Sequence, residues 1–251
     1  MSGHNKWSTI KHKKGAADAK RGKVFSKLAK EILVAVKSGG GDPAANITLR
    51  ALIQKARSVN MPADNIDRAI KKGTGELESE VLEEIMYEGY AGGGVAIIVE
   101  VVTDNRNRST AEVRHAFSRY DANLAQSGAV SRSFQRKGYF LVGADKIDED
   151  QLLELALEAG ADDVARDGDN FEVTTEPASF GDVLEALQGA GVEPEESEIT
   201  LLPDTTVPVT EKSKASSLLR FIDALDDLED VQKVHSNFDI DDALMAELQE
   251  D

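Results

Sequence analysis

Apolar residues recur every three or four positions in the first part of the chain, a spacing that predicts α-helices. The first predicted helix covers residues 20–37. Its apolar side consists of Phe25, Leu28, Ile32 and Val36. The glycines at 39–41 end this helix, because consecutive glycines stop a helix and permit a left-handed turn.

Two further helices follow the glycines. Asp42 and Pro43 begin the second, since Asp accepts free backbone N–H groups and Pro suits the first helical position. This helix extends to about Val59, and a third covers about residues 63–72. We therefore predict a helical domain that, with the preceding leader, spans residues 1–75.

The pattern changes to β-type sequence after an acidic connector at residues 76–84. Two apolar, β-branched runs, 85–90 and 95–103, flank three glycines at 92–94 and predict a β-hairpin. The glycines do not predict a phosphate-binding loop, because a strand follows them where such a loop needs a helix N-terminus. A helix from Asp104 to about Tyr120 follows the hairpin.

Residues 138–203 show the element order β-α-β-β-α-β, which is typical of a ferredoxin-like sheet. The predicted strands are 139–142, 162–166, 171–175 and 198–202, and the predicted helices are 148–158 and 180–188. Residues 204–251 add a strand, a helix at 212–226, a strand at 231–235 and an acidic tail, too few elements to fold alone. We expect them to complete a discontinuous middle domain with residues 76–137. The predicted fold class is α+β, with an N-terminal three-helix domain followed by two α+β, ferredoxin-like domains, one inserted in the other.

The net charge of −17 conceals a strong separation of charge along the chain. Residues 1–75 contain 16 Lys and Arg against 5 Asp and Glu, a net charge of +11, and the remaining residues carry −28. A basic end can bind phosphate while the acidic remainder repels it. The chain therefore favours a polyanionic partner that is held at one end.

The basic side of the first helix lies opposite its apolar side, and a basic leader precedes it. We predict that nucleic acid, chiefly through its phosphates, is contacted by His4, Lys6, Trp7, Lys11, His12, Lys13, Lys14, Lys20, Arg21, Lys23, Lys27 and Lys30. Only two carboxylates within this stretch, Asp18 and Glu31, can neutralise the cations. A lysine stripe is also the ordinary solvated side of a helix, and that alternative stays open.

A second basic segment covers residues 104–137, with a local net charge of +4. Its candidates for phosphate contact are Arg106, Arg108 and Arg114. Scattered surface arginines explain this segment equally well.

The sequence gives little support for catalysis, a metal site or a membrane-spanning segment. The chain has no Cys and four His, and no two His have a metal-ligand spacing on one element, so we expect no metal, no cofactor and no catalysis. The acidic clusters at 226–230 and 239–242 lack the pattern of a calcium loop and are interpreted as solvated helix ends. No run of about 20 apolar residues is present, and the start lacks the apolar core of a secretory signal, so we expect a cytoplasmic, non-membrane protein. We also expect it to be a monomer.

Several blocks of the sequence together resemble the YebC-type proteins. The blocks are GHNKW at residues 3–7, IKHKKG at 10–15, DAKRGK at 18–23, NMP at 60–62, RAIKKG at 68–73, YEGY at 87–90, TDNRNR at 103–108, EVR at 112–114 and NFDI at 237–240. The resemblance implies three domains around a cleft and a nucleic-acid-binding role without catalysis. The chain departs from the family pattern at Gly92, where a proline is usual, and at Arg132, where an aromatic residue is frequent.

Three functional hypotheses remain. The resemblance implies a DNA-binding transcriptional regulator, the usual description of the family. It also implies the alternative of a ribosome-associated translation factor that binds ribosomal or transfer RNA and relieves stalling at proline-rich stretches. An acidic protein–protein adaptor using residues 138–251 is the third, and it leaves the basic leader unexplained.

Overall fold

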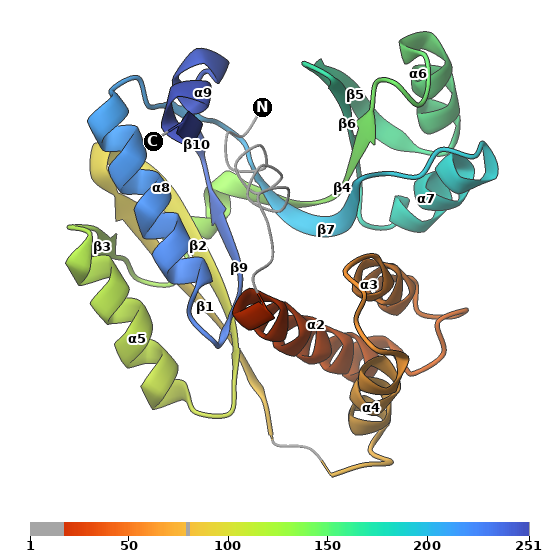
Figure 1. Cartoon of the computed structure of the whole chain (residues 1–251), viewed down its shortest axis with the longest axis horizontal. Helices are drawn as coiled ribbons and strands as arrows, with labels where there is room; N and C mark the ends of the chain where they lie inside the picture. The colour runs from red at the N-terminus through yellow and green to blue at the C-terminus, as the bar shows by residue number, and fades with distance from the viewer. Residues whose placement is uncertain (1–17, 79–80, 251) are drawn as a thin grey trace.

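The computed structural model of the chain describes residues 18–78 and 81–250 (Figure 1). Its elements form three groups: N-terminal helices, a four-stranded antiparallel sheet with long helices on one face, and a second four-stranded antiparallel sheet with helices of its own. Helices combined with antiparallel sheets confirm the predicted α+β class.

The N-terminal group consists of α2 (Asp18–Gly39), α3 (Ile47–Ser58) and α4 (Ala63–Thr74). The predicted apolar side of α2 faces inward, with Leu28, Ile32 and Val36 buried in a common core with residues of α3 and α4. Burial of these side chains fixes which side of α2 remains for other contacts, because the basic positions lie across the helix.

The start of α3 was predicted wrongly. Asp42 does not begin the helix; it closes a turn in which its carboxylate accepts a hydrogen bond from the Ala44 N–H at 2.9 Å. Asn46 is the cap, and its side-chain oxygen accepts from the Leu49 N–H at 3.0 Å. The Asn46 amide also donates to the carbonyls of Ala35 and Gly40, both at 2.9 Å, and thus joins α2 to α3.

We expect Asn46→Ala to lower the free energy of unfolding by about 2 kcal/mol, because it removes a helix cap and two donated hydrogen bonds from a buried site. Chemical denaturation measures the loss. Asp42→Ala is the matched control, with an expected loss of about 0.5 kcal/mol since its turn is exposed. Equal losses in the two variants would contradict the assignment of Asn46 as the cap.

The first sheet has the strand order β3-β1-β2-β9. Its strands are β1 (Glu83–Ala91), β2 (Val95–Thr103), β3 (Asn123–Leu124) and β9 (Val231–Ser236). Helices α5 (Arg106–Arg119) and α8 (Lys212–Asp226) cover one face of this sheet (Figure 1). Between them Phe117 and Phe221 pack edge to face, with ring centres 5.0 Å apart. The predicted hairpin β1-β2 lies at the centre of this sheet, an order that differs from the ferredoxin-like one.

The hairpin turn η1 (Gly92–Gly94) requires glycine at two positions. Gly93 and Gly94 have φ angles of 79° and 81°, in the left-handed region that disfavours side chains. Gly92 has no positive φ, and a Cβ added there meets open space. The absence of proline at position 92 is therefore compatible with the turn.

The second sheet has the order β5-β6-β4-β7, which is the ferredoxin-like order expected for the β-α-β-β-α-β unit. Its elements are β4 (Phe134–Gly143), α6 (Glu149–Glu158), β5 (Ala161–Asp167), β6 (Asn170–Thr175), α7 (Phe180–Gly189) and β7 (Glu196–Pro203). The core on its helix-covered face includes Phe140 stacked on Phe180, with ring centres 4.8 Å apart.

Strand β4 begins at Phe134, five residues before the predicted start at Tyr139. The polar residues 135–137 conceal this extension, which pairs with β7 and brings Phe134 and Leu201 against Ala96 and Ile98 of the first sheet. The β4-β7 ribbon thus connects the two sheets (Figure 1). The division of the chain at residues 75, 137 and 203 stays a prediction.

The C-terminal segment contains more structure than the predicted acidic tail. Strand β8 (Val207–Pro208) pairs in parallel with β10 (Phe238–Asp239), and α9 (Asp242–Glu250) follows. The carboxylate of Asp241 accepts from the Leu244 N–H at 2.8 Å, and Leu244 and Met245 enter the core of the first sheet. No helix in the described part of the chain is long and apolar enough to cross a membrane.

Candidate nucleic-acid interface

The predicted phosphate-contacting residues fall into three groups. The leader residues His4, Lys6, Trp7, Lys11, His12, Lys13 and Lys14 lie outside the described residues. Lys20, Arg21, Lys23, Lys27 and Lys30 belong to α2. Arg106, Arg108 and Arg114 belong to α5.

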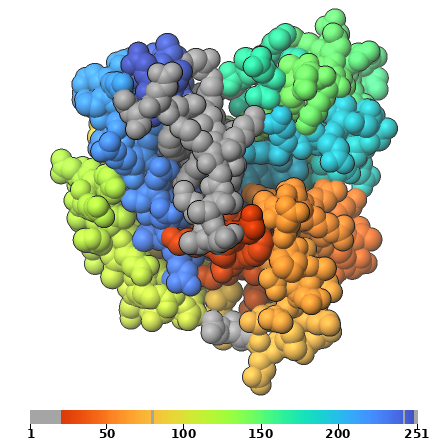
Figure 2. Space-filling view, in the orientation of Figure 1, coloured from red at the N-terminus to blue at the C-terminus, as the bar shows by residue number. Residues whose placement is uncertain are grey.

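The lysine side of α2 faces the turn between α8 and β9. The Lys23 ammonium donates to the Asp227 carbonyl at 3.1 Å and lies 3.9 Å from the Asp227 carboxylate. The Lys27 ammonium donates to the carbonyl and carboxylate of Asp226, at 2.6 and 3.1 Å. Figure 2 shows the adjacency, with α2 in red between α8 in blue and helices α3 and α4 in orange.

This arrangement corrects the expectation that only Asp18 and Glu31 neutralise the cations of this stretch. Counting charges along the sequence missed carboxylates about 200 residues away that the fold brings to α2. The lysine side of α2 is thus a contact between the N-terminal helices and the first sheet. Whether these lysines also contact phosphate stays a prediction.

Asp230, at the end of the same turn, is the buried centre of the contact. The exposed fraction of its side chain is only 2%, and its carboxylate accepts hydrogen bonds from Lys30 at 2.8 Å, Ser109 at 2.7 Å and Thr103 at 3.0 Å. Arg108 Nη2 lies 2.8 Å from the same carboxylate. Burial alone would raise the pKa of Asp230, but these donors outweigh it and hold the pKa well below its usual range.

Asp230 thereby joins the two predicted basic segments, since Lys30 comes from α2 and Arg108 from α5. Arg108 also pairs with Asp104 at 2.8 Å, and both carboxylates raise its pKa above the usual value. The interpretation of the 226–230 cluster as a solvated helix end is wrong for Asp230. Its burial followed from no local sequence signal, because its partners lie far away in the chain.

The other arginines of α5 lie further from this contact. Arg106 is 3.7 Å from the carboxylate of Glu83, with both side chains largely exposed. Arg114 is exposed on the same helix. Neither is brought beside the lysines of α2 by any described contact.

A second charged junction, which no local sequence pattern indicates, joins all three groups of elements. The carboxylate of Glu198, on β7, lies 3.2 Å from the Lys55 ammonium of α3 and 3.1 Å from the Lys233 ammonium of β9. Burial would raise the pKa of Glu198, but the two lysines outweigh it and lower the pKa far below normal. Glu198 in turn raises the pKa of Lys55. Both lysines are therefore held in structural pairs.

His235, which the sequence places at the end of a strand, is buried beside this junction. Its Nε2 lies 3.3 Å from a Glu100 oxygen, and its Nδ1 lies 3.5 Å from the Thr200 hydroxyl of the second sheet. Burial would raise the pKa of Glu100, but His235 and the nearby cations Lys233 and Arg136 lower it overall. Within the described residues no cluster of three His, Asp or Glu side chains is arranged to hold a metal ion.

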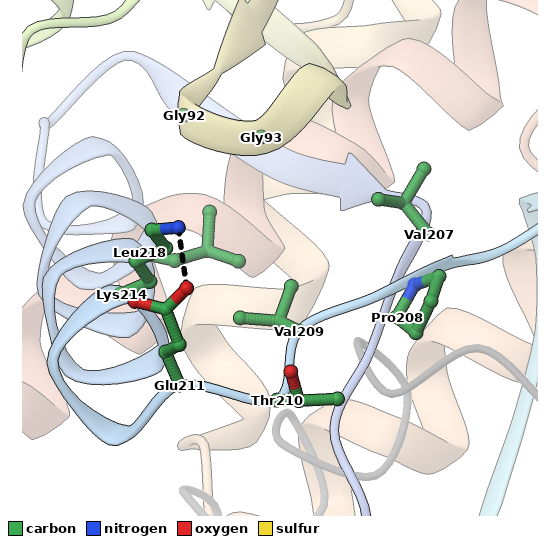
Figure 3. Close-up of a pocket in the computed structure, with 9 residues that line it drawn as sticks. All are labelled: Gly92, Gly93, Val207, Pro208, Val209, Thr210, Glu211, Lys214 and Leu218. Carbon is green, nitrogen blue, oxygen red and sulfur yellow. Dashed lines mark hydrogen bonds and ion pairs between the residues drawn. The ribbon is translucent and has the colours of Figure 1, made fainter.

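A small cavity of about 110 Å³ lies at the hairpin tip, beside the start of α8 (Figure 3). Val207, Val209 and Leu218 provide its apolar walls, and η1 lies across from them. Its lysine, Lys214, is bound to Glu211 at 2.6 Å. The cavity contains none of the predicted phosphate-contacting residues, so it adds nothing to the interface.

Comparison with known proteins places both parts of the chain in one family. Residues 5–76 match the model for the TACO1/YebC protein N-terminal domain, and residues 82–238 match the model for the TACO1/YebC second and third domain. A crystal structure of a conserved hypothetical protein from Aquifex aeolicus is 48% identical, with a TM-score of 0.81 over 90% of this chain and 93% of that one.

Two of the similar relatives carry the name "probable transcriptional regulatory protein". The one from Geobacter sulfurreducens is 56% identical over 99% of this chain and all of its own. The one from Desulfotalea psychrophila is 54% identical over the full length of both.

Proposed function

Because the chain belongs to the TACO1/YebC family, whose relatives above are named as transcriptional regulators, we propose that it is a DNA-binding transcriptional regulator. The names of the relatives support a regulatory role. That the partner is DNA is our own inference, and it is supported by the separation of charge along the chain.

The cations available for phosphate lie toward the N-terminus. Residues 1–75 carry a net charge of +11, although Lys55 of this segment is committed to an ion pair inside the protein, as is Arg108 of α5. The basic leader that precedes α2 is therefore proposed as the primary phosphate contact. The acidic remainder limits binding to one end, because it repels the same phosphates.

The test compares the partners directly. We expect the purified protein to bind a labelled duplex in fluorescence anisotropy, and to select genomic fragments that it binds about 10³-fold more tightly than random duplex, as specific binders do. The matched probe is single-stranded RNA of the same length and sequence. Tighter binding to RNA, together with sedimentation with ribosomes that RNase abolishes, would overturn the DNA assignment in favour of a role in translation.

A further inference from the structure

The contact between α2 and the 226–230 turn places three lysines opposite three carboxylates. Lys23, Lys27 and Lys30 follow one side of the helix at intervals of four and three residues. Seven residues of α-helix rise about 10 Å, a length over which duplex DNA presents about six phosphates. The acidic turn therefore occupies the side of α2 whose charge and length suit a nucleic-acid backbone.

The three pairs differ in how firmly they are held. Asp230 is buried and shared with Arg108, Ser109 and Thr103, so Lys30 is fixed to the core of the first sheet. Asp227 and Lys23 have exposed side-chain fractions of 63% and 54%, and their charged atoms are 3.9 Å apart. A pair of this kind, exposed to water and at this distance, adds little to stability. Asp226 and Lys27 are intermediate, with exposed fractions of 35% and 18%.

We propose that the carboxylates of Asp226 and Asp227, beside the main-chain carbonyls that the same lysines reach, act as a built-in competitor for nucleic acid, holding Lys23 and Lys27 in the free protein and giving them up to phosphates when nucleic acid binds. Asp230 keeps Lys30 in place, so the N-terminal helices stay attached during the exchange. This inference rests on the proposed binding of a nucleic acid and adds a regulation to it.

The energetics favour an exchange that depends on the number of phosphates. A tethered carboxylate competes at the effective concentration of an intramolecular partner, of order millimolar, so an isolated anion does not displace it easily. A polyanion already held by the leader presents its phosphates at comparable local concentration. Release of condensed counterions then adds a gain that a carboxylate turn cannot offer. The two carboxylates therefore weaken the binding of isolated anions to Lys23 and Lys27 more than the binding of a polyanion that the leader already holds.

The test is the double variant Asp226→Asn with Asp227→Asn, which preserves side-chain size and leaves Asp230 intact. On duplex DNA we expect tighter binding, by roughly 10-fold at 0.1 M salt, and a slope of log affinity against log salt that is steeper by up to about 1.8. Affinity is measured by anisotropy across a salt series, and thermal unfolding verifies that the variant is folded.

Two controls distinguish the loss of the competing carboxylates from the effect of a less negative net charge. Glu158→Gln with Asp163→Asn changes the net charge equally, at exposed positions on α6 and β5, and should leave both affinity and slope nearly unchanged. In a background that carries Lys23→Gln and Lys27→Gln, the asparagine substitutions should have no effect, because the competed lysines are absent. A gain that persists in that background, or that the control reproduces, would overturn the proposal.

Elution from heparin, a polyanion other than DNA, tests the competition independently of the proposed binding to DNA. If no variant binds DNA but the asparagine variant elutes from heparin at higher salt than wild type and control, competition stands and the DNA assignment fails. If wild type binds DNA and the asparagine variant binds it with equal affinity and slope, the pairs only join the domains and the competition is refuted.

Discussion

Asp230→Ala is expected to lower the free energy of unfolding by about 3 kcal/mol, the larger of the effects on stability predicted for this chain. The substitution removes a buried carboxylate on which Lys30, Arg108, Ser109 and Thr103 converge. It takes one buried acceptor away from two cations and two hydroxyls, although Arg108 keeps its pair with Asp104 and Lys30 keeps its hydrogen bond to the Val102 carbonyl. Chemical denaturation at neutral pH measures the loss.

The pH dependence gives this prediction a second readout. The folded pKa of Asp230 lies below its unfolded value of about 3.9, so the unfolded state binds more protons as the pH falls through that range. The stabilisation is complete above about pH 4 and is lost as the pH falls through the depressed folded pKa. The difference in the free energy of unfolding between wild type and Asp230→Ala should therefore be constant near neutral pH and become smaller in acid.

The matched control is Asp227→Ala, three residues earlier in the same turn. Its carboxylate is largely exposed, so its expected effect on stability is within about 0.5 kcal/mol and nearly independent of pH. If the two alanine variants lost the same free energy, Asp230 would not be the centre of the contact.

Periodicity predicted the elements well where each has its own apolar side. Helix α8 begins at Lys212 and ends at Asp226 as expected, because its buried residues recur with helical spacing between polar ends. The prediction was wrong where one sequence pattern is compatible with two structures. An Asp-Pro pair can cap a helix or close a turn, and at Asp42 it closes a turn. The segment of α9 was predicted to be an acidic tail because of its carboxylates, although Leu244 and Met245 give the helix a buried side.

The candidate interface was less predictable than the fold. The sequence pattern identified the basic residues of α2 from Lys20 to Lys30 but none of their partners, since Asp226, Asp227 and Asp230 come from the other end of the chain. Glu198 was missed for the same reason, because its two lysines belong to different groups of elements. Charge along a sequence predicts where cations lie. Only the tertiary structure shows which of them are already neutralised.

The leader, in contrast, is expected to carry the largest effect on binding. Replacing Lys6, Lys11, Lys13 and Lys14 with glutamine removes four cations that the sequence places together. Four lost phosphate contacts lower the slope of log affinity against log salt by roughly 3.6 on duplex, or about 2.8 on a single strand. At 0.1 M salt this corresponds to binding about 10³-fold weaker.

The matched control removes four cations from the acidic part of the chain instead. The residues changed to glutamine are Lys146, Arg166, Lys212 and Lys214, each of which lies beside a carboxylate or carbonyl group. The change alters the net charge equally but removes no proposed contact with phosphate. Anisotropy across a salt series should show a small loss of affinity with the slope intact. The leader variant should show both losses, because condensed counterions are released only where cations meet phosphates. A leader variant that keeps the wild-type slope would exclude these lysines as the phosphate contact, and would direct the search to Arg106 and Arg114 on α5.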